Sequence, residues 1–533
     1  MTATAAAPGG IRLRSATGRW VLTAAVLGSS MAMLDSTVVN VALPTIGRQL
    51  HTSLAGLQWT VTAYTLTLAG LILLGGSLGD RLGRRRVFVI GVTWFAAASA
   101  LCGAAPGIGV LIVARALQGI GGALLTPGSL AIMQATYRAD DRPRAIGAWS
   151  GLGGVATAVG PFLGGWIVGA AGWRWIFLLN LPLAALVIAV SVRHVPESSD
   201  PGSRGRFDVA GAVLAALALA GITDALIEAP AHPLPRAALT GGAGVLAGAA
   251  FVVVERRRSR RPEPVSPMLP LDVFASRQFT AVNVATFLVY GALSGMLFLL
   301  VLNLQVVSGF SPLAAGISLL PSTALMLLLS ARAGTLAQRF GPRWLMTIGP
   351  LVAGGGLLLL TRAGPHASYL PDVLPGVVLF GLGLSATVAP LTATVLASAE
   401  VRHAGVASGV NNAVARAAGL IAVAGLPLAV GLTSTGYHDP ARLYSGFKAA
   451  MVLCACLLAA AAVLSALTID NSVLKPAAGQ PPAPEPECCP SCPVGAPPLE
   501  PGGRERGHPA LPAGAGTSRS AGPRPGPRPG PGT

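Results

Sequence analysis

The sequence has little charge. Aspartate, glutamate, lysine and arginine make up only 11% of its 533 residues, whereas about 25% is usual in soluble chains, which need charge to cover their surface. This scarcity excludes an ordinary soluble protein, and a hydrophobic content of 52% excludes a disordered chain. We therefore expect an all-α integral membrane protein that crosses the bilayer many times.

Lysine is almost absent. Only Lys448 and Lys475 occur, and neither follows a glycine, which excludes the GxxxxGK loop that binds ATP phosphates. The many arginines lie in short clusters between apolar runs, a pattern typical of membrane topology rather than of nucleic-acid binding. We expect no nucleic-acid partner and no ATPase subunit.

Motifs for metal binding and catalysis are also missing. The seven histidines are scattered mainly in loops, no nucleophile motif is present, and the six cysteines give no disulfide framework. Cys488, Cys489 and Cys492 lie near the carboxyl end without a histidine, which makes a poor metal site. We expect no enzymatic activity, no metal and no cofactor.

Fourteen apolar runs are long enough to cross about 30 Å of hydrocarbon as helices. The first run carries Asp35 and continues past it, so we do not interpret it as a cleaved signal peptide. The predicted spans are 20–44, 55–78, 86–104, 108–131, 144–168, 174–193, 209–228, 236–254, 279–302, 312–333, 343–361, 372–396, 407–432 and 445–467.

The arginines between the spans indicate the orientation. With the amino terminus inside, most of them fall in cytoplasmic loops, including the clusters at Arg84–Arg86 and Arg256–Arg258. An even number of spans then places both termini in the cytoplasm. We expect a multi-pass protein of the plasma membrane.

A repeated loop sequence indicates an internal duplication. GSLGDRLGRRR at Gly76–Arg86 returns as GTLAQRFGPR at Gly334–Arg343, which predicts two six-helix halves with two helices between them, a 6+2+6 arrangement. The Pro- and Gly-rich carboxyl end is expected to be disordered. The predicted segments are a cytoplasmic amino terminus (1–19), a first half (20–193), two inserted helices (207–256), a cytoplasmic linker (257–278), a second half (279–467) and a cytoplasmic tail (468–533).

The first copy of this repeat is a candidate gating loop, with Gly76, Asp80, Arg81, Gly83 and Arg84 as its defining residues. Glycines allow a tight turn between helices, and the Asp80 carboxylate can accept hydrogen bonds from helix N-termini or arginines. Such a loop can latch one half against the other in one state. The alternative is a positively charged turn without this role.

Asp35 and Arg115 lie deep within apolar spans, where a charged side chain is expensive and indicates function. Asp35 can exchange protons between two water-accessible states, or it can be a structural carboxylate that an arginine neutralises. Arg115 can tune Asp35, bind a carboxylate of a ligand or hold the bundle together.

The fifth span has small residues at every fourth position, Ala156, Gly160 and Gly164, with Pro161 among them. Small side chains let a neighbouring helix approach closely. The GLGGVA sequence in the same span follows no strand, so we do not interpret it as a dinucleotide-binding loop. We expect a helix-packing face.

Other polar residues within the spans are candidate contacts to a substrate, although a face buried between helices explains each of them equally well. Asp224 and Glu228 of the seventh span can reach interfacial water and are weaker candidates for a proton site. Arg416 can also extend to the cytoplasmic surface. The candidate cavity residues are Gln58, Tyr64, Gln118, Asn283, Tyr290, Asn411 and Arg416.

Together these motifs resemble the major facilitator superfamily and, within it, the fourteen-span drug:proton antiporters. The resemblance covers roughly residues 15–470. It is carried by the gating loop and by LDSTVVNVALP at Leu34–Pro44, QWTVTAY at Gln58–Tyr64, RALQGIGGA at Arg115–Ala123, GPFLGG at Gly160–Gly165, WRWIFLLNLP at Trp173–Pro182, FDVAG at Phe207–Gly211 and SGFSPLAAGISLLP at Ser308–Pro321.

The resemblance implies roles for several residues. Asp35 corresponds to the acid of the first helix, Arg115 to an arginine linked to proton coupling, and Gly160–Gly164 to a motif associated with antiport. Gln338 stands where the first repeat has Asp80, so the second loop is expected to be the weaker latch. The tenth span has no acid, unlike that of some quaternary-ammonium exporters, which puts transport of dications in doubt.

We therefore predict a proton-coupled antiporter that exports small amphipathic drugs, antibiotics or toxic metabolites by alternating access. Its energy source would be the proton gradient, and we expect a monomer. Two alternatives are open at this point: a nutrient uptake permease or facilitator, and a membrane sensor that signals through the tail. The antiport-type GPFLGG sequence is an argument against uptake. The excess of arginine over lysine is typical of a GC-rich bacterial gene.

Overall fold

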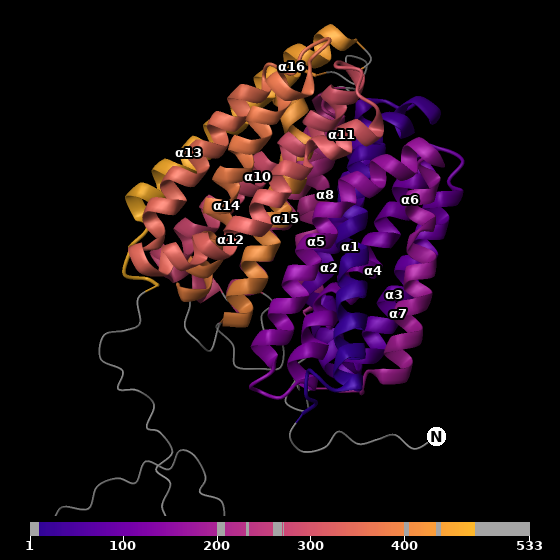
Figure 1. Cartoon of the computed structure of the whole chain (residues 1–533), viewed down its shortest axis with the longest axis vertical. Helices are drawn as coiled ribbons and strands as arrows, with labels where there is room; N and C mark the ends of the chain where they lie inside the picture. Colours follow the sequence, from indigo (N-terminus) through magenta and orange to yellow (C-terminus); the bar gives the residue numbers. More distant parts are fainter. Residues whose placement is uncertain are drawn as a thin grey trace, which may run out of the picture. The chain divides into compact units, whose positions relative to one another are not determined.

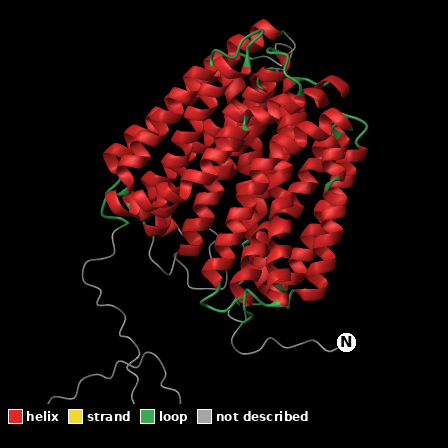
Figure 2. Cartoon of the chain, in the orientation of Figure 1, coloured by secondary structure: helices red, strands yellow, loops and turns green. Residues whose placement is uncertain are grey.

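The computed structural model describes residues 10–199, 208–230, 234–259, 269, 271–398, 404–432, 437 and 439–474. This part of the chain is helical, apart from one isolated bridge between Ile11 and Tyr137 (Figure 2). The predicted tail beyond residue 474, with Cys488, Cys489 and Cys492, lies outside the described residues, and so do residues 260–268 of the predicted linker.

Fourteen helical spans within the described residues are long and apolar enough to cross a membrane, as predicted (Figure 1). Three spans are composite: α6 with α7, α11 with α12, and the helical turn η2 with α14. The elements are α1 (Ala16–Gln49), α2 (Leu54–Leu82), α3 (Arg84–Ala104), α4 (Ile108–Thr136), α5 (Arg142–Ala170), α6 (Arg174–Leu178), α7 (Asn180–His194), α8 (Val209–Glu228), α9 (Leu234–Ser259), η1 (Leu271–Ala275), α10 (Arg277–Val306), α11 (Pro312–Ser318), α12 (Leu320–Phe340), α13 (Pro342–Leu360), η2 (Tyr369–Val373), α14 (Leu374–Ala397), α15 (Ala404–Ala429) and α16 (Pro440–Thr468).

Side-chain caps mark where several of these helices begin. The Ser53 hydroxyl accepts a hydrogen bond from the Gly56 amide at the start of α2, and Ser311 does the same for the Ala314 amide at the start of α11. Within lipid a helix satisfies its own backbone, so free amides remain only at such ends. The caps therefore fix the turns between spans.

The same packing pattern occurs twice. In the amino-terminal set, α1–α7, helices α2 and α3 pack on α4, and α1 packs on α5. In the carboxy-terminal set, α10–α16, helices α12 and α13 pack on α14, and α10 packs on α15. Helices α8 and α9 pack on each other, and α8 also contacts α2 and α15. The pattern supports a duplication, and the 6+2+6 arrangement stays a prediction.

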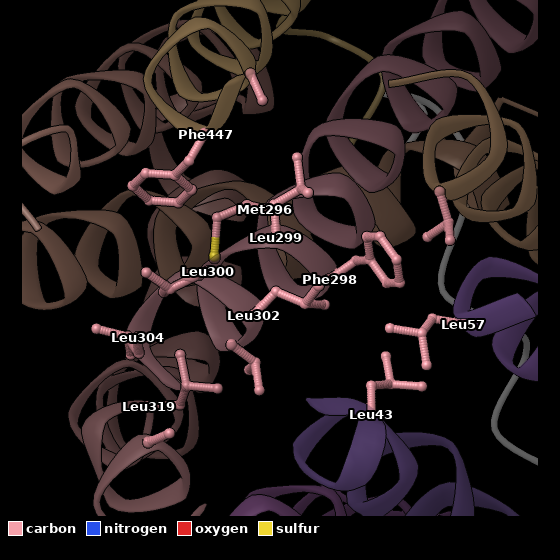
Figure 3. Close-up of a cluster of buried hydrophobic side chains, with 14 of the residues drawn as sticks. Leu43, Leu57, Met296, Phe298, Leu299, Leu300, Leu302, Leu304, Leu319 and Phe447 are labelled. Atoms are coloured by element: carbon pink, nitrogen blue, oxygen red, sulfur yellow. The ribbon is translucent and has the colours of Figure 1, made fainter. Parts of the chain in front are cut away.

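A large apolar cluster joins the two sets. Phe298 and Leu302 of α10 lie in one buried cluster with Leu43 of α1 and Leu57 of α2. In Figure 3 the ring of Phe298 extends from α10 toward Leu43 and Leu57. Close packing of these side chains holds the two sets together at one end, which we call the Thr52 end after the residue between α1 and α2.

Hydrogen bonds between the two sets lie at the same end. Among the described residues, the side-chain hydrogen bonds that cross between the sets run from Gln58 Nε2 to the carbonyls of Val423 (2.8 Å) and Ala424 (3.0 Å), from Gln305 Nε2 to the Val41 carbonyl (2.9 Å) and from Tyr437 Oη to the Thr52 carbonyl (2.8 Å). All of these groups are uncharged. The two sets are thus fastened at the Thr52 end by neutral contacts.

Gly121 of α4 provides a test of the close helix packing. A Cβ at this position would lie 2.6 Å from the backbone nitrogen of Phe95 in α3, whereas a Cβ at Gly109 of the same helix would meet nothing within 4 Å. We expect Gly121→Ala to lower the free energy of unfolding by about 1–3 kcal/mol, because overpacking forces the two helices apart. Gly109→Ala should be neutral or stabilising, since alanine favours helix more than glycine does. Thermal unfolding of the purified protein in detergent compares both variants with the parent. Equal midpoints for the two variants would contradict the expectation.

Candidate functional site

Asp35 of α1 and Arg115 of α4 form an ion pair inside the amino-terminal set, and each side chain is only 1% exposed. Arg115 Nη1 donates to Asp35 Oδ2, and Arg115 Nε donates to the Thr60 carbonyl of α2 at 3.0 Å. The two charged residues that the sequence singles out are therefore partners. Each neutralises the other where an unpaired charge would be costly.

Two amide side chains complete the surroundings of the carboxylate. Gln118 Nε2 donates to Asp35 Oδ1 and to Ser99 Oγ, both at 2.8 Å, while Gln118 Oε1 accepts from Arg115 Nη1 at 2.7 Å. Asn180 Nδ2 lies 3.4 Å from Asp35 Oδ1 and 3.3 Å from Ser99 Oγ. Both oxygens of Asp35 thus have donors, and the network connects α1, α2, α3, α4 and α7.

Aromatic rings cover the cation of this pair. The guanidinium carbon of Arg115 lies 4.3 Å from the centre of the Tyr64 ring and 5.8 Å from that of Phe177. The Tyr64 hydroxyl donates to the Ala32 carbonyl at 3.2 Å. The ring faces attract the guanidinium, so Tyr64 helps to hold Arg115 beside Asp35.

Sequence reasoning missed Thr60, Ser99 and Asn180 as members of this network. Asn180 stands in the WRWIFLLNLP motif, where a lone amide among apolar residues was a usable signal. Thr60 contributes only its backbone carbonyl, and Ser99 is one of many hydroxyls on apolar helices. No feature of the sequence distinguishes these two.

The candidate gating loop is shorter than predicted. Helix α2 continues through Leu82, so Gly76, Asp80 and Arg81 are helical and Gly83 alone separates α2 from α3. The prediction of a loop from Gly76 is therefore wrong, because the helix continues past the apolar run and ends only where the backbone turns. Gly83 has φ 106°, and Gly341 in the second copy has φ 89°, a left-handed backbone that favours glycine.

Near Gly83, Asp80, Arg84 and Glu197 form contacts within the amino-terminal set. Asp80 accepts from Arg84 Nη2 at 2.8 Å, four residues along the chain. The Glu197 carboxylate, which sequence reasoning missed, accepts from the backbone amides of Arg85 (3.0 Å) and Arg86 (3.2 Å) at the start of α3. A carboxylate at a helix N-terminus is favourable, so Glu197 fastens the chain after α7 to α3. The latch role stays a prediction.

The small residues of α5 pack against α1. A Cβ at Gly164 would lie 2.9 Å from Val38 Cγ1, and one at Gly160 would lie 3.1 Å from Thr37 Cβ. Pro161 lies inside α5, and Ala156 is partly buried. The structure therefore supports a helix-packing face.

The remaining candidates are dispersed. Gln58 fastens the Thr52 end, and Gln118 belongs to the Asp35 network rather than to an open surface. In the carboxy-terminal set, Asn411 Nδ2 donates to Thr286 Oγ1 at 2.8 Å and lies 3.4 Å from Asn283 Oδ1. A further set is only partly buried: Tyr290, Arg416, Asp224 and Glu228, the last of which accepts a hydrogen bond from Trp59 Nε1 at 3.2 Å. Substrate contact by any of them stays a prediction.

Within the described ranges, no three His, Cys, Asp or Glu side chains lie together so that they could hold a metal ion.

Comparison with known proteins identifies related chains. The profile of the Major Facilitator Superfamily matches residues 25–424. The chain is 36% identical over 420 residues to the multidrug resistance protein Stp of Mycobacterium tuberculosis, which covers 78% of this chain and 76% of that protein. It is 36% identical over 452 residues to the methylenomycin A resistance protein of Bacillus subtilis, with 83% and 94% covered.

The fold also has solved counterparts. The structure of a bacterial homologue of the human lysosomal transporter Spinster superposes with a TM-score of 0.59, covering 85% of this chain and 97% of that one at 19% identity. The likeness concerns the fold.

A double-mutant cycle tests the Asp35–Arg115 pair. Removing either charge leaves the other one buried and unpaired, so Asp35→Asn and Arg115→Gln should each lower stability by about 3–5 kcal/mol. The double variant should cost at least about 1 kcal/mol less than the two losses added together. Thermal unfolding in detergent measures the cycle. The exposed pair Asp439–Arg442, with 49% and 72% of the side chains exposed, is the control and should couple weakly. Additive losses at Asp35 and Arg115 would contradict the pairing.

Proposed function

The chain belongs to the major facilitator superfamily, and on this premise we propose that it exports small amphipathic drugs or antibiotics in exchange for protons. The proposal includes the bacterial plasma membrane as its location, a monomer as the working unit, and the proton gradient as the energy source. The function is transport rather than catalysis, without a resident cofactor.

The relatives support the export of drugs. One is named a multidrug resistance protein and another a resistance protein for methylenomycin A, and each aligns with more than three quarters of this chain. A further relative is the tetracenomycin C resistance and export protein of Streptomyces glaucescens, at 35% identity over 412 residues. Resistance to a drug or an antibiotic is common to these names, and the last of them also names export.

The buried pair of Asp35 and Arg115 carries the proposal of proton exchange. A carboxylate that is 1% exposed changes its charge only when the protein gives a proton access to it. Protonation of Asp35 removes its attraction for Arg115 and frees hydrogen bonds from Gln118, which changes contacts among several helices at once. Loss of the proton restores the pair. A two-state transporter needs such a link between one charge and the packing of its helices.

The contacts between the two sets support alternating access. If the arginine-rich Gly83 end is cytoplasmic, the Thr52 end faces outward, and the hydrogen bonds of Gln58, Gln305 and Tyr437 close the molecule to the outside. The structure then corresponds to an inward-facing state. Separation at the Thr52 end would release a compound outside.

Proton release from vesicles tests the exchange. Inside-out membrane vesicles are energised so that their lumen is acidic, and cationic, neutral and anionic antibiotics and dyes are added. We expect release of lumenal protons for the parent and a loss of at least about 10-fold for Asp35→Asn, because an amide carries no exchangeable carboxyl proton. The control is Asp439→Asn, which changes an exposed acid at the start of α16. Release that persists in Asp35→Asn, at equal protein in the membrane, would remove Asp35 from the proton path and direct attention to Asp224 and Glu228.

A further inference from the structure

Arg416 is a second arginine in the interior, and its surroundings differ from those of Arg115. It lies near the middle of α15, and its Nε donates to Asn412 Oδ1 at 2.9 Å. Within the described residues, no carboxylate forms an ion pair with Arg416, and its two terminal nitrogens have no acceptor. Arg115, by contrast, has Asp35, Gln118 and the Thr60 carbonyl.

Among the described residues, the charge of Arg416 therefore has no ion-pair partner. A guanidinium stays protonated in proteins, and an unpaired charge at this depth of a membrane is costly. Arg416 is partly buried on α15, which packs against α2, and its neighbour Asn412 is exposed. A charged group avoids hydrocarbon, so the accessible part of this side chain needs contact with water or with a polar ligand.

The fold itself does not require a cation at this position. Two contacts between the sets correspond to each other in the repeated packing pattern. Gln58 of α2 contacts the carbonyl of Val423 in α15. Gly316 of α11 lies against the carbonyl of Pro161 in α5. Arg416 stands seven residues before Val423 in α15, and Gly154 stands seven residues before Pro161 in α5. A glycine fills the matching place, so the packing of α15 does not explain the arginine.

We propose that Arg416 binds the anionic group of the transported compound, so that the substrates of this protein are amphipathic organic acids. The inference rests on the proposed export function and names its substrate class. Asp35 and Arg115 cancel each other, which leaves Arg416 as a net positive charge at the α2–α15 boundary. A carboxylate can accept hydrogen bonds from both terminal nitrogens of a guanidinium, and the apolar part of the compound would remain among the helices.

Matched acids and esters test this preference. The purified full-length protein in detergent is titrated with pyrene-1-butyric acid and with its uncharged methyl ester, and binding is followed by the rise in the thermal unfolding temperature. We expect the parent to bind the acid at least about 10-fold more tightly than the ester. Arg416→Gln should lose about 30-fold or more for the acid alone, since removal of one member of a buried charge pair has an effect of this size.

Three further variants make the result specific. Arg416→Lys should keep part of the preference for the acid, because it retains the charge but not the planar fork. Arg174→Gln removes an arginine that lies over Trp173 and should behave like the parent. Asp439→Asn, which changes an exposed acid at the start of α16, should also keep the preference. Proton release from vesicles is measured separately from binding, so a failure of proton exchange and a failure of this inference give different results.

Equal binding of acid and ester by the parent, or no binding of either, would overturn the assignment. It would also be overturned if Arg416→Gln weakened acid and ester alike, since the arginine would then support the packing rather than the anion. The unfolding temperatures without ligand show whether each variant is folded.

Discussion

The ion pair of Asp35 and Arg115 is the interaction on which the arrangement of the amino-terminal helices depends. Hydrocarbon offers no hydrogen bonds to a charge, so each member needs its partner in place before the helices can pack. The pair recruits the Thr60 carbonyl, Gln118 and Asn180, and through them α2, α4 and α7. A change of protonation at one carboxylate therefore acts on several helices together rather than on one side chain.

The carboxy-terminal set repeats the packing but not the chemistry. Where the first set has an ionic network, the second has neutral hydrogen bonds from Asn411 to Thr286 and Asn283. Its partly buried cation, Arg416, has no ion-pair partner among the described residues. The two sets thus share a packing pattern and differ in their charges. Proton exchange is proposed for the first set, and binding of the ligand's anionic group is proposed for the second.

Sequence reasoning found the number of spans, the repeated glycine turn and the two charged residues of the buried pair. Apolar length and charge scarcity are local properties, and the cost of a charge in lipid makes Asp35 and Arg115 conspicuous. It failed where the outcome depends on tertiary contacts. The continuation of α2 to Leu82 follows from backbone geometry at Gly83, and the recruitment of Ser99 follows from the position of Gln118. That Arg416 has no carboxylate partner in the part of the chain that the structure describes is likewise visible only once the helices are assembled.

The Thr52 end is closed by uncharged groups, and this determines how much free energy its opening requires. Each hydrogen bond of Gln58, Gln305 and Tyr437 contributes only about 0.5–1.5 kcal/mol, because water replaces it on opening. The free energy of protonating a single site changes by about 1.4 kcal/mol per pH unit. One pH unit at one site is thus comparable with one of these hydrogen bonds, and the proposed proton exchange would shift the balance of this closure. An end held by amides, a phenol and apolar side chains is thus the kind of closure that a single proton site can control.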